Sequence, residues 1–296
     1  MKALFITTHT NDVYSLIRAW ECWNAEPASW IKFDYTSKRS PDTEIIASAQ
    51  DIKPDIIFYI GACTFKGTPS TDALKTLRNL APSIHICCDA GDPPWHEIID
   101  KYRRFECFDK QVGIDGVQSA PVDLVTLTPV DPRPYSGVPV DKTIKCGFSG
   151  GIGKRGLRYD LVQQLQSSGI LSFRNRNING GYDDHVSFLQ SCHVVLNTAW
   201  SGTGSVKQVK GRVLETAFAG SALLEHADAP TVDLFPRNSI YTYTSAKDAK
   251  EIIRFLDTGD ARIKSEICSD FIRKKWNAPT IYRQIMEGVI DVDTTE

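Results

Sequence analysis

The chain has 296 residues, which is enough for about two domains of ordinary size. Hydrophobic residues make up 42% of it and charged residues 24%, a balance that excludes a disordered or collagen-like chain because there is ample apolar material for cores. The 34 basic and 36 acidic residues give a formal net charge of −2, so the composition predicts no overall attraction to nucleic acid or to anionic membranes.

The sequence predicts a cytoplasmic protein. Its longest apolar stretch, residues 56–63, is far shorter than the ~20 residues that span a bilayer, and the apolar run near the N-terminus is too short for a signal peptide. The eight cysteines form no CxxC pair, and most lie in apolar, strand-like segments, where a free cysteine behaves as a small buried hydrophobe. We therefore expect reduced thiols, as in a cytoplasmic protein.

Short apolar runs alternate with longer amphipathic stretches, a pattern typical of βα units and a parallel sheet. In the first half of the chain, strands are expected at residues 2–8, 31–35, 55–60 and 83–88, with a weaker candidate at 105–108. Helical spacing covers residues 13–23, 42–52 and 70–80, and Ser70 is the expected N-cap of the last of these helices.

The pattern changes over residues 128–141, TPVDPRPYSGVPVD, which hold four prolines and show no periodicity. Because proline restricts the backbone, this segment predicts an extended linker. After it the alternation resumes, with strands expected at residues 143–148, 194–197, 222–225 and 239–243. Helices are expected at residues 155–168, 183–190, 210–220, 246–256, 261–276 and 279–290.

The sequence therefore predicts an α/β protein of two Rossmann-like parallel-sheet domains, residues 1–141 and 142–296. Ligands of open α/β sheets bind at the carboxyl ends of the strands, so the two domains are expected to face a central cleft. The last helix, around Tyr282, is expected to pack back on the first domain. The alternative is a single large sheet with an irregular insertion.

The most informative stretch is residues 206–225, VKQVKGRVLETAFAGSALLE, which predicts a helix that Gly220 ends before a strand. Lys210 and Arg212 fall in the first turn, where cations are unfavourable against the positive end of the helix dipole unless an anion binds there. Glu215 lies about one turn further along, where its carboxylate could accept hydrogen bonds from the two vicinal hydroxyls of a ribose. The alternative is a solvated helix start with an ion pair inside the helix.

The order of residues in this stretch resembles the signature of the group 1 glycosyltransferases of GT-B architecture, especially the small spore-maturation-type subfamily. The family pattern runs K-x-R-x-x-E-x-x-x-x-G-x-x-L-L, and its positions are occupied here by Lys210, Arg212, Glu215, Gly220, Leu223 and Leu224. Residues 231–256 and the final helical tail are similar to the family's usual continuation. Larger retaining families place a second Glu eight positions before the ribose-binding one, but that position here is Lys207, so their sugar contact is not carried over.

This resemblance implies a GT-B fold and the transfer of a sugar from a UDP- or GDP-sugar to a glycan or small-molecule acceptor. It implies no metal and no cofactor besides the nucleotide-sugar co-substrate, with the donor in the second domain and the acceptor in the first. Two alternatives stay open: a nucleotide-sugar epimerase of the same architecture, and a non-catalytic protein that binds a nucleotide or a sugar. No nucleic-acid partner is expected.

A second segment, residues 144–155 (IKCGFSGGIGKR), supports a donor site. A strand runs into Gly150 and Gly151, which allow close backbone approach, and then into Lys154 and Arg155, which can neutralise a diphosphate. The spacing fits neither a Walker A motif nor GxGxxG. In related GT-B enzymes the corresponding loop contacts the donor phosphate, while the alternative is a simple glycine turn.

The loop at residues 197–205, NTAWSGTGS, follows a strand that is expected to end at the same sheet edge. Its polar side chains, among them Asn197 and Thr203, are expected to donate hydrogen bonds to the nucleotide or the sugar. Trp200 either stacks on a base or serves as ordinary packing.

The first domain is expected to hold the acceptor and the catalytic base in two loops that follow strands. Asp89 and Asp92, in the sequence DAGDPPW, could take a proton from an acceptor hydroxyl, and His9 has an unperturbed pKa near neutrality. The alternative for Asp92, which precedes two prolines, is to cap the next helix. The six histidines form no HxxxH or HxH pair and the two aspartates do not have DxD spacing, so no metal site is expected.

Overall fold

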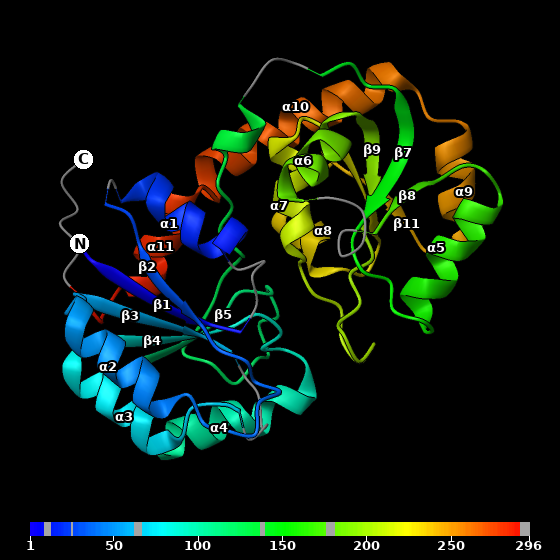
Figure 1. Ribbon diagram of the computed structural model, residues 1–296. Helices are drawn as coiled ribbons and strands as arrows, with labels where there is room; N and C mark the ends of the chain where they lie inside the picture. Colours follow the sequence, from blue (N-terminus) through cyan, green and yellow to red (C-terminus); the bar gives the residue numbers. More distant parts are fainter. Residues whose placement is uncertain (9–12, 25, 62–66, 137–139, 176–180, 291–296) are drawn as a thin grey trace. The chain divides into compact units, whose positions relative to one another are not determined.

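The computed structural model describes residues 1–8, 13–24, 26–61, 67–136, 140–175 and 181–290, whose helices and strands Figure 1 labels. The chain divides into two compact units, Met1–Asp131 with Ala278–Glu296 and Pro132–Asn277, and each is described by itself. Within the described ranges, no helix is both long enough and apolar enough to cross a bilayer.

The first unit contains a six-stranded parallel sheet in the order β2-β1-β3-β4-β5-β6 (Figure 1). Its strands are β1 (Ala3–Thr7), β2 (Ser29–Lys32), β3 (Ile56–Ile60), β4 (Ser83–Cys87), β5 (Lys110–Gly113) and β6 (Leu124–Val125). Its helices are α1 (Arg18–Trp23, preceded by a π-helical turn, Val13–Ile17), α2 (Asp42–Ile52), α3 (Thr71–Leu80), α4 (His96–Arg104) and α11 (Ala278–Met286).

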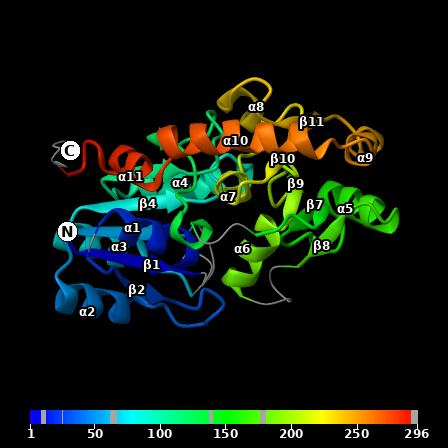
Figure 2. The ribbon, with the colours of Figure 1, turned by 90° about the horizontal axis from the view of Figure 1, so that it is seen from above.

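Helices cover both faces of this sheet (Figures 1 and 2). On one face, β1 and β3 pack against α2, α3 and α4 in an aliphatic core. On the other face, Phe5 and Phe58 stack at 4.7 Å between ring centroids, and Trp20 of α1 and Tyr282 of α11 meet edge to face at 5.2 Å. The Tyr282 hydroxyl donates a hydrogen bond to the carbonyl of Leu16. The first core is therefore completed by a helix from the far end of the chain.

The second unit contains a five-stranded parallel sheet in the order β11-β10-β9-β7-β8. Its strands are β7 (Ile144–Ser149), β8 (Ser172–Arg174), β9 (Cys192–Leu196), β10 (Ala222–His226) and β11 (Tyr241–Tyr243). Its helices are α5 (Leu157–Ser167), α6 (Tyr182–Gln190), α7 (Gly211–Phe218), α8 (Pro230–Leu234), α9 (Ala246–Arg254) and α10 (Thr258–Lys275). From β7 the chain first builds β8 on one side and then β9 on the other, so the strand order reverses between β7 and β9.

The second unit begins inside the proline-rich segment. Tyr135 is buried, its ring lies 6.3 Å from that of Phe218, and its hydroxyl lies 3.3 Å from the hydroxyl of Tyr182. The sequence-based division at residues 141 and 142 lies further along the same segment. Because an aromatic anchor is set between the prolines, the part from Pro132 onwards packs with the second unit instead of acting as a free linker.

The predicted architecture of two parallel-sheet α/β domains is confirmed, and the alternative of one large sheet is wrong. The cap of α3 is also confirmed, because the Ser70 hydroxyl accepts a hydrogen bond from the Ala73 N–H at 3.1 Å. The strand expected at residues 105–108 is wrong. There α4 ends at Arg104, the chain turns through Glu106 with a φ of 50°, and the strand of this region starts only at Lys110.

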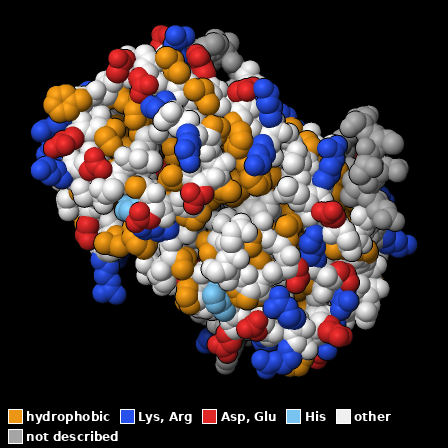
Figure 3. Space-filling model, turned by 180° about the vertical axis from the view of Figure 1, so that it is seen from behind, with side chains coloured by type: hydrophobic (Ala, Val, Ile, Leu, Met, Phe, Trp, Pro, Cys, Tyr) orange, Lys and Arg blue, Asp and Glu red, His pale blue; other side chains and the backbone are white. Residues whose placement is uncertain are grey.

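Four cysteines, Cys107, Cys146, Cys192 and Cys268, are buried free thiols. Burial raises the pKa of Cys107 to about 11 and those of Cys192 and Cys268 to about 12, so these thiols are neutral and pack as apolar groups. On the face of the molecule drawn in Figure 3, basic and acidic side chains are interspersed, as the nearly equal numbers of the two charges suggest.

Candidate functional site

The carboxyl ends of β7 and β9 form the edge at which the second sheet reverses its strand order. The two strands pair in parallel, with Cys146 opposite Val194 and Gly147 opposite Val195. In open α/β sheets, ligands bind in the crevice outside the strand ends at such a reversal. The loops that leave these two strands are therefore the place to look for a site.

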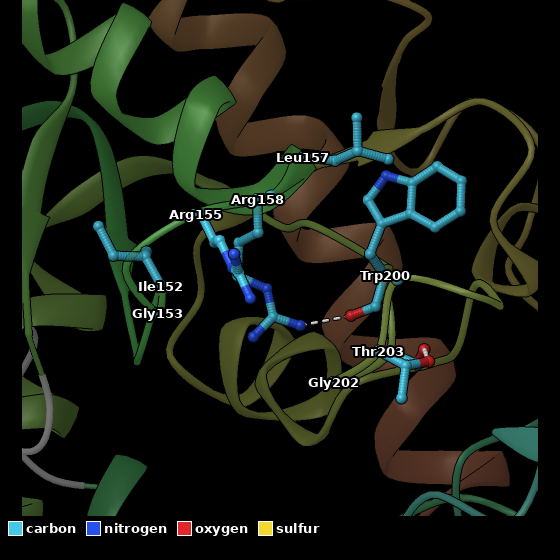
Figure 4. A pocket seen from close by; sticks show the side chains of 11 residues that line it. Ile152, Gly153, Arg155, Leu157, Arg158, Trp200, Gly202 and Thr203 are labelled. Atoms are coloured by element: carbon cyan, nitrogen blue, oxygen red, sulfur yellow. Dashed lines mark hydrogen bonds between the residues drawn. The ribbon is translucent and has the colours of Figure 1, made fainter. Parts of the chain in front are cut away.

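A cavity of about 460 Å³ lies between these two loops (Figure 4). One side is formed by the loop after β7 and the start of α5, with Ile152, Gly153, Arg155, Gly156, Leu157 and Arg158. The other side is formed by the loop after β9, with Trp200, Ser201, Gly202, Thr203 and Gly204.

Arg158 connects the two sides of the cavity. Its Nη1 donates to the Gly151 carbonyl at 3.3 Å, and its Nη2 donates to the Trp200 carbonyl, the bond drawn in Figure 4. Arg155 lies in the same region of the chain and is exposed. The cavity thus has one guanidinium that fixes its shape and a second that is open to solvent.

Trp200 both packs and lines the cavity, so the two alternatives for this residue are combined. The Lys207 ammonium lies 4.8 Å from the centre of its ring and forms an ion pair of 2.8 Å with Asp228. The Thr203 hydroxyl lies 3.3 Å from that of Ser201, on the same wall. A cavity with an aromatic wall, hydroxyls and an exposed cation can accept a ligand that has a flat ring and a negative charge.

Behind the cavity, Arg212 ties the ends of β7 and β9 together. It is the second residue of α7, and its guanidinium lies 4.3 Å from the centre of the Phe148 ring. Its Nε donates to the Ser149 carbonyl at 2.5 Å, and its Nη1 donates to Oδ1 of Asn197 at 2.9 Å. The prediction that Arg212 lies in the first turn of a helix is confirmed.

Gly150 is required by this arrangement. Its φ of 148° is one that other residues rarely adopt, and a Cβ added there would overlap Nη2 of Arg212. The close approach expected at this glycine is thus occupied by Arg212 of the chain itself.

Asn197 serves the site from behind. It is fully buried, and its Nδ2 donates to Oε2 of Glu225 at 2.6 Å, which also accepts from the Thr231 hydroxyl at 3.0 Å. Burial raises the pKa of Glu225 to about 7, although hydrogen bonds from Asn197, the His226 N–H and Thr231, with the charge of Arg212, act in the opposite direction. Asn197 therefore links Arg212 to a buried carboxyl.

Glu215 belongs to a second buried network. Its Oε2 lies 3.0 Å from Nε2 of His185, and Nδ1 of that histidine lies 2.8 Å from the Ser149 hydroxyl. His185 and Ser149 are each 1% exposed, and Glu215 is 4% exposed. The group expected to bind a ribose is thus held by α6 and the end of β7.

The remaining donor-site candidates also belong to the second unit. Lys154 is exposed in the loop after β7, and Lys210 is the N-cap residue of α7, with its Nζ donating to Oε1 of Gln208. Of all the predicted donor-site residues, Arg155 and Thr203 line the cavity. Those in the two buried networks support its floor.

The candidate bases of the first unit follow β4. The Asp92 N–H donates to the Asp89 carbonyl at 3.0 Å in a tight turn, and Asp92 is 1% exposed. Asp92 is the N-cap residue of the short turn Pro93–Trp95, but its side chain makes no capping hydrogen bond. His9 lies outside the described residues. Among the residues that are described, no group of three or more His, Cys, Asp or Glu side chains could hold a metal ion.

Sequence reasoning missed Arg158, His185 and Glu225. Arg158 lies three residues after Arg155 at a helix start, and this spacing, which puts both on neighbouring turns, is a signal that could have pointed to it. His185 and Glu225 have no such signal, because each gains its meaning only from a partner far away in the chain.

No protein-family model and no curated protein matches this sequence. Solved structures do match. Anabaena Alr3699/HepE in complex with UDP and glucose is 12% identical over 97% of this chain and 98% of its own, with a TM-score of 0.65. An alpha-glucosyltransferase in complex with UDP-glucose and DNA containing an abasic site is 9% identical over 97% and 98%, with a TM-score of 0.64. AviGT4, a glycosyltransferase involved in avilamycin A biosynthesis, is 13% identical over 97% and 96%, with a TM-score of 0.54. The fold of the chain is GT-B, as predicted.

Proposed function

We propose that the protein is a glycosyltransferase that moves a sugar from a UDP- or GDP-sugar to a glycan or small-molecule acceptor. The observation that carries this proposal is the cavity at the β7–β9 reversal, with Arg155 exposed on its wall and Arg212 bound behind it. The structures of Alr3699/HepE with UDP and with UDP-glucose, which have the same fold, support a nucleotide-sugar donor.

In this proposal the bond between the anomeric carbon and the diphosphate oxygen breaks, and the diphosphate leaves with the electron pair. The anomeric carbon forms its new bond to an acceptor hydroxyl oxygen, whose proton passes to a base. Lys154, Arg155, Lys210 and Arg212 stabilise the charge that develops on the diphosphate. Glu215 accepts hydrogen bonds from the ribose.

The first unit supplies the acceptor site in this proposal. Asp89, Asp92 and His9 are the candidate bases, because a carboxylate or a neutral imidazole can take the proton of a hydroxyl. The buried free thiols of both units support an origin in a reducing compartment such as the cytoplasm.

Titration calorimetry with UDP and with GDP, beside an assay of donor hydrolysis without acceptor, tests the proposal. A transferase binds one nucleotide and releases it slowly from the sugar, since water can replace the acceptor. A binding protein binds without turnover, and an epimerase changes the sugar without releasing the nucleotide. Failure to bind either nucleotide would contradict the proposed function.

We further propose that these cations act without a metal ion. Turnover is then expected to be unchanged after dialysis against EDTA and to gain less than about twofold from added Mg²⁺ or Mn²⁺. A loss of activity in EDTA that either ion restores would show that a metal neutralises the diphosphate instead.

A further inference from the structure

Glu215 is oriented by a hydrogen-bonded chain that starts at the end of β7. The Ser149 hydroxyl meets Nδ1 of His185 at 2.8 Å, and Nε2 of His185 meets Oε2 of Glu215 at 3.0 Å. The side chain of His185 is 1% exposed and that of Glu215 is 6% exposed. The contact is therefore made almost entirely away from water.

The chemistry of the three groups fixes the direction of each bond. An ionised carboxylate only accepts, so the Nε2 atom that faces Glu215 carries a proton. In the neutral imidazole, Nδ1 is then an acceptor, and the Ser149 hydroxyl donates to it. Ser149 thus selects the tautomer of His185 that can hold Glu215, as outer partners do for the histidines that bind metals.

A hydrogen bond to one oxygen of a carboxylate also orients the other oxygen. A carboxylate offers about four lone-pair sites, so the bond from His185 is compatible with further donors on the same group. Two vicinal hydroxyls need a carboxylate whose plane is fixed, because both of their hydrogen bonds depend on its direction.

Ser149 also joins this chain to the cation site. Its side chain donates to His185, while its backbone carbonyl accepts from Nε of Arg212 at 2.5 Å. One residue at the end of β7 therefore sets the position of both groups that the proposed function assigns to the nucleotide, Glu215 for the ribose and Arg212 for the diphosphate.

We propose that His185 is a positioning residue for ribose recognition, which holds the Glu215 carboxylate in place and is itself held in one tautomer by Ser149. This inference rests on the proposed function. It differs from a merely structural pairing of α6 with α7 in one respect. Its loss must weaken the recognition of the two ribose hydroxyls and not binding in general.

The experiment compares the affinities of the full-length protein for UDP and for 2′,3′-dideoxy-UDP, or for the guanosine pair if GDP binds better. The ratio of the two affinities isolates the hydroxyls, and we expect a value of ten or more in the unchanged protein, on the order of one charge-assisted hydrogen bond. Glu215→Ala is expected to lower it to about one. His185→Leu is expected to lower it to about two, and His185→Gln, which keeps an N–H donor, to recover part of it.

Ser149→Ala removes only a hydroxyl and leaves the carbonyl for Arg212, so it provides a variant that folds even if His185→Leu does not. We expect it to lower the ratio about threefold. His193→Leu is the matched control, because this histidine of β9 is partly buried but belongs to neither network, and its ratio is expected to stay unchanged.

The outcomes separate the two proposals. If the unchanged protein binds no nucleoside diphosphate, the proposed function and this inference both fail. If Glu215→Ala leaves the ratio high, Glu215 does not bind the ribose and the inference fails, whereas sugar transfer stands. If Glu215→Ala abolishes the preference while His185→Leu and Ser149→Ala keep it, the pair is only structural and this inference alone is overturned.

Discussion

Arg212 is the residue on which structure and proposed chemistry meet. Its hydrogen bonds to the Ser149 carbonyl and to Asn197 hold a guanidinium at the ends of two strands, where a planar group with several donors fits and a single ammonium does not. Preorganised charge of this kind stabilises a transition state without reorganisation during the reaction. A cation that also holds the site together is expected to affect both turnover and stability.

We predict that Arg212→Ala slows turnover on the order of a hundredfold, about 2.7 kcal/mol in activation free energy. Because diphosphate charge grows as the sugar bond breaks, kcat and kcat/KM should fall together, which steady-state kinetics would reveal. Arg212→Lys should recover only part of the rate. Arg262→Ala, which removes a 74% exposed arginine side chain from α10, is the matched control and should keep full activity. Full activity in Arg212→Ala would place the phosphate site elsewhere.

Glu225 makes the stability of the second unit depend on pH. Its pKa is about 7 in the folded protein, whereas an unfolded glutamate has a pKa of roughly 4.3. The folded state therefore binds this proton more tightly than the unfolded state. The contribution of Glu225 to the free energy of unfolding falls as the pH rises from about 4 to about 7, and it stays constant above that range.

Glu225→Gln removes this titration. At about 1.4 kcal/mol per pKa unit, the free energy of unfolding of the variant relative to the unchanged protein should rise by about 2 to 3 kcal/mol between pH 5 and pH 8. Urea denaturation at the two pH values measures it. Glu251→Gln, at an exposed position of α9, should show no such difference. Equal pH dependence in both variants would mean that Glu225 is ionised throughout.

At the scale of elements, periodicity predicted the long segments well and the short ones poorly. Residues 42–52 are α2 as predicted, and the helices at residues 70–80 and 183–190 differ from α3 and α6 by one residue at one end. The short strands β5, β6 and β8 and the helices α4 and α8 were missed. A strand of two to four residues, such as Leu124–Val125, contains no full period, so only its pairing in the sheet defines it.

The candidate site shows the same limit. Gly150, Arg155, Arg212 and Glu215 could be predicted because each lies in a local pattern at a strand end or a helix start. The hydrogen bond between His185 and Glu215 joins residues thirty positions apart, and the bond between Asn197 and Glu225 spans twenty-eight. Such partners depend on how helices pack on the sheet, and no short motif records that.

The loop between β7 and α5 is predicted to act through its exposed cations. Lys154 and Arg155 are both solvent-exposed there, so a double change to alanine should leave the fold intact. Since each contributes to the charge around the diphosphate, we expect kcat/KM to fall about tenfold or more, an effect that should shrink at high salt because exposed charges are screened. Steady-state kinetics at two ionic strengths measures it. Lys247→Ala with Lys250→Ala, on α9, removes the same charge away from the site and should leave kcat/KM unchanged.

At the scale of the whole molecule, each unit has a hydrophobic core of its own. In the second unit, Phe148 and Cys146 of β7, Leu196 of β9 and Leu224 of β10 pack against α5 and α9. The opposite face of that sheet is covered by helices α6, α7 and α10. All residues of the proposed donor site belong to this unit, whereas Asp89 and Asp92 belong to the other.

This division predicts that a fragment of residues 132–277 folds on its own and binds the nucleotide. It begins before Tyr135, which anchors the start of the unit, and it contains both buried networks of the site. We expect a cooperative thermal transition by circular dichroism and a UDP dissociation constant within about threefold of that of the full chain. Transfer of sugar should be absent, because the candidate bases and the proposed acceptor loops are missing. The same fragment with Glu215→Ala should bind UDP at least tenfold more weakly, which shows that binding uses the proposed site. A folded fragment that fails to bind UDP, while the full chain binds it, would mean that the donor site needs residues of the first unit.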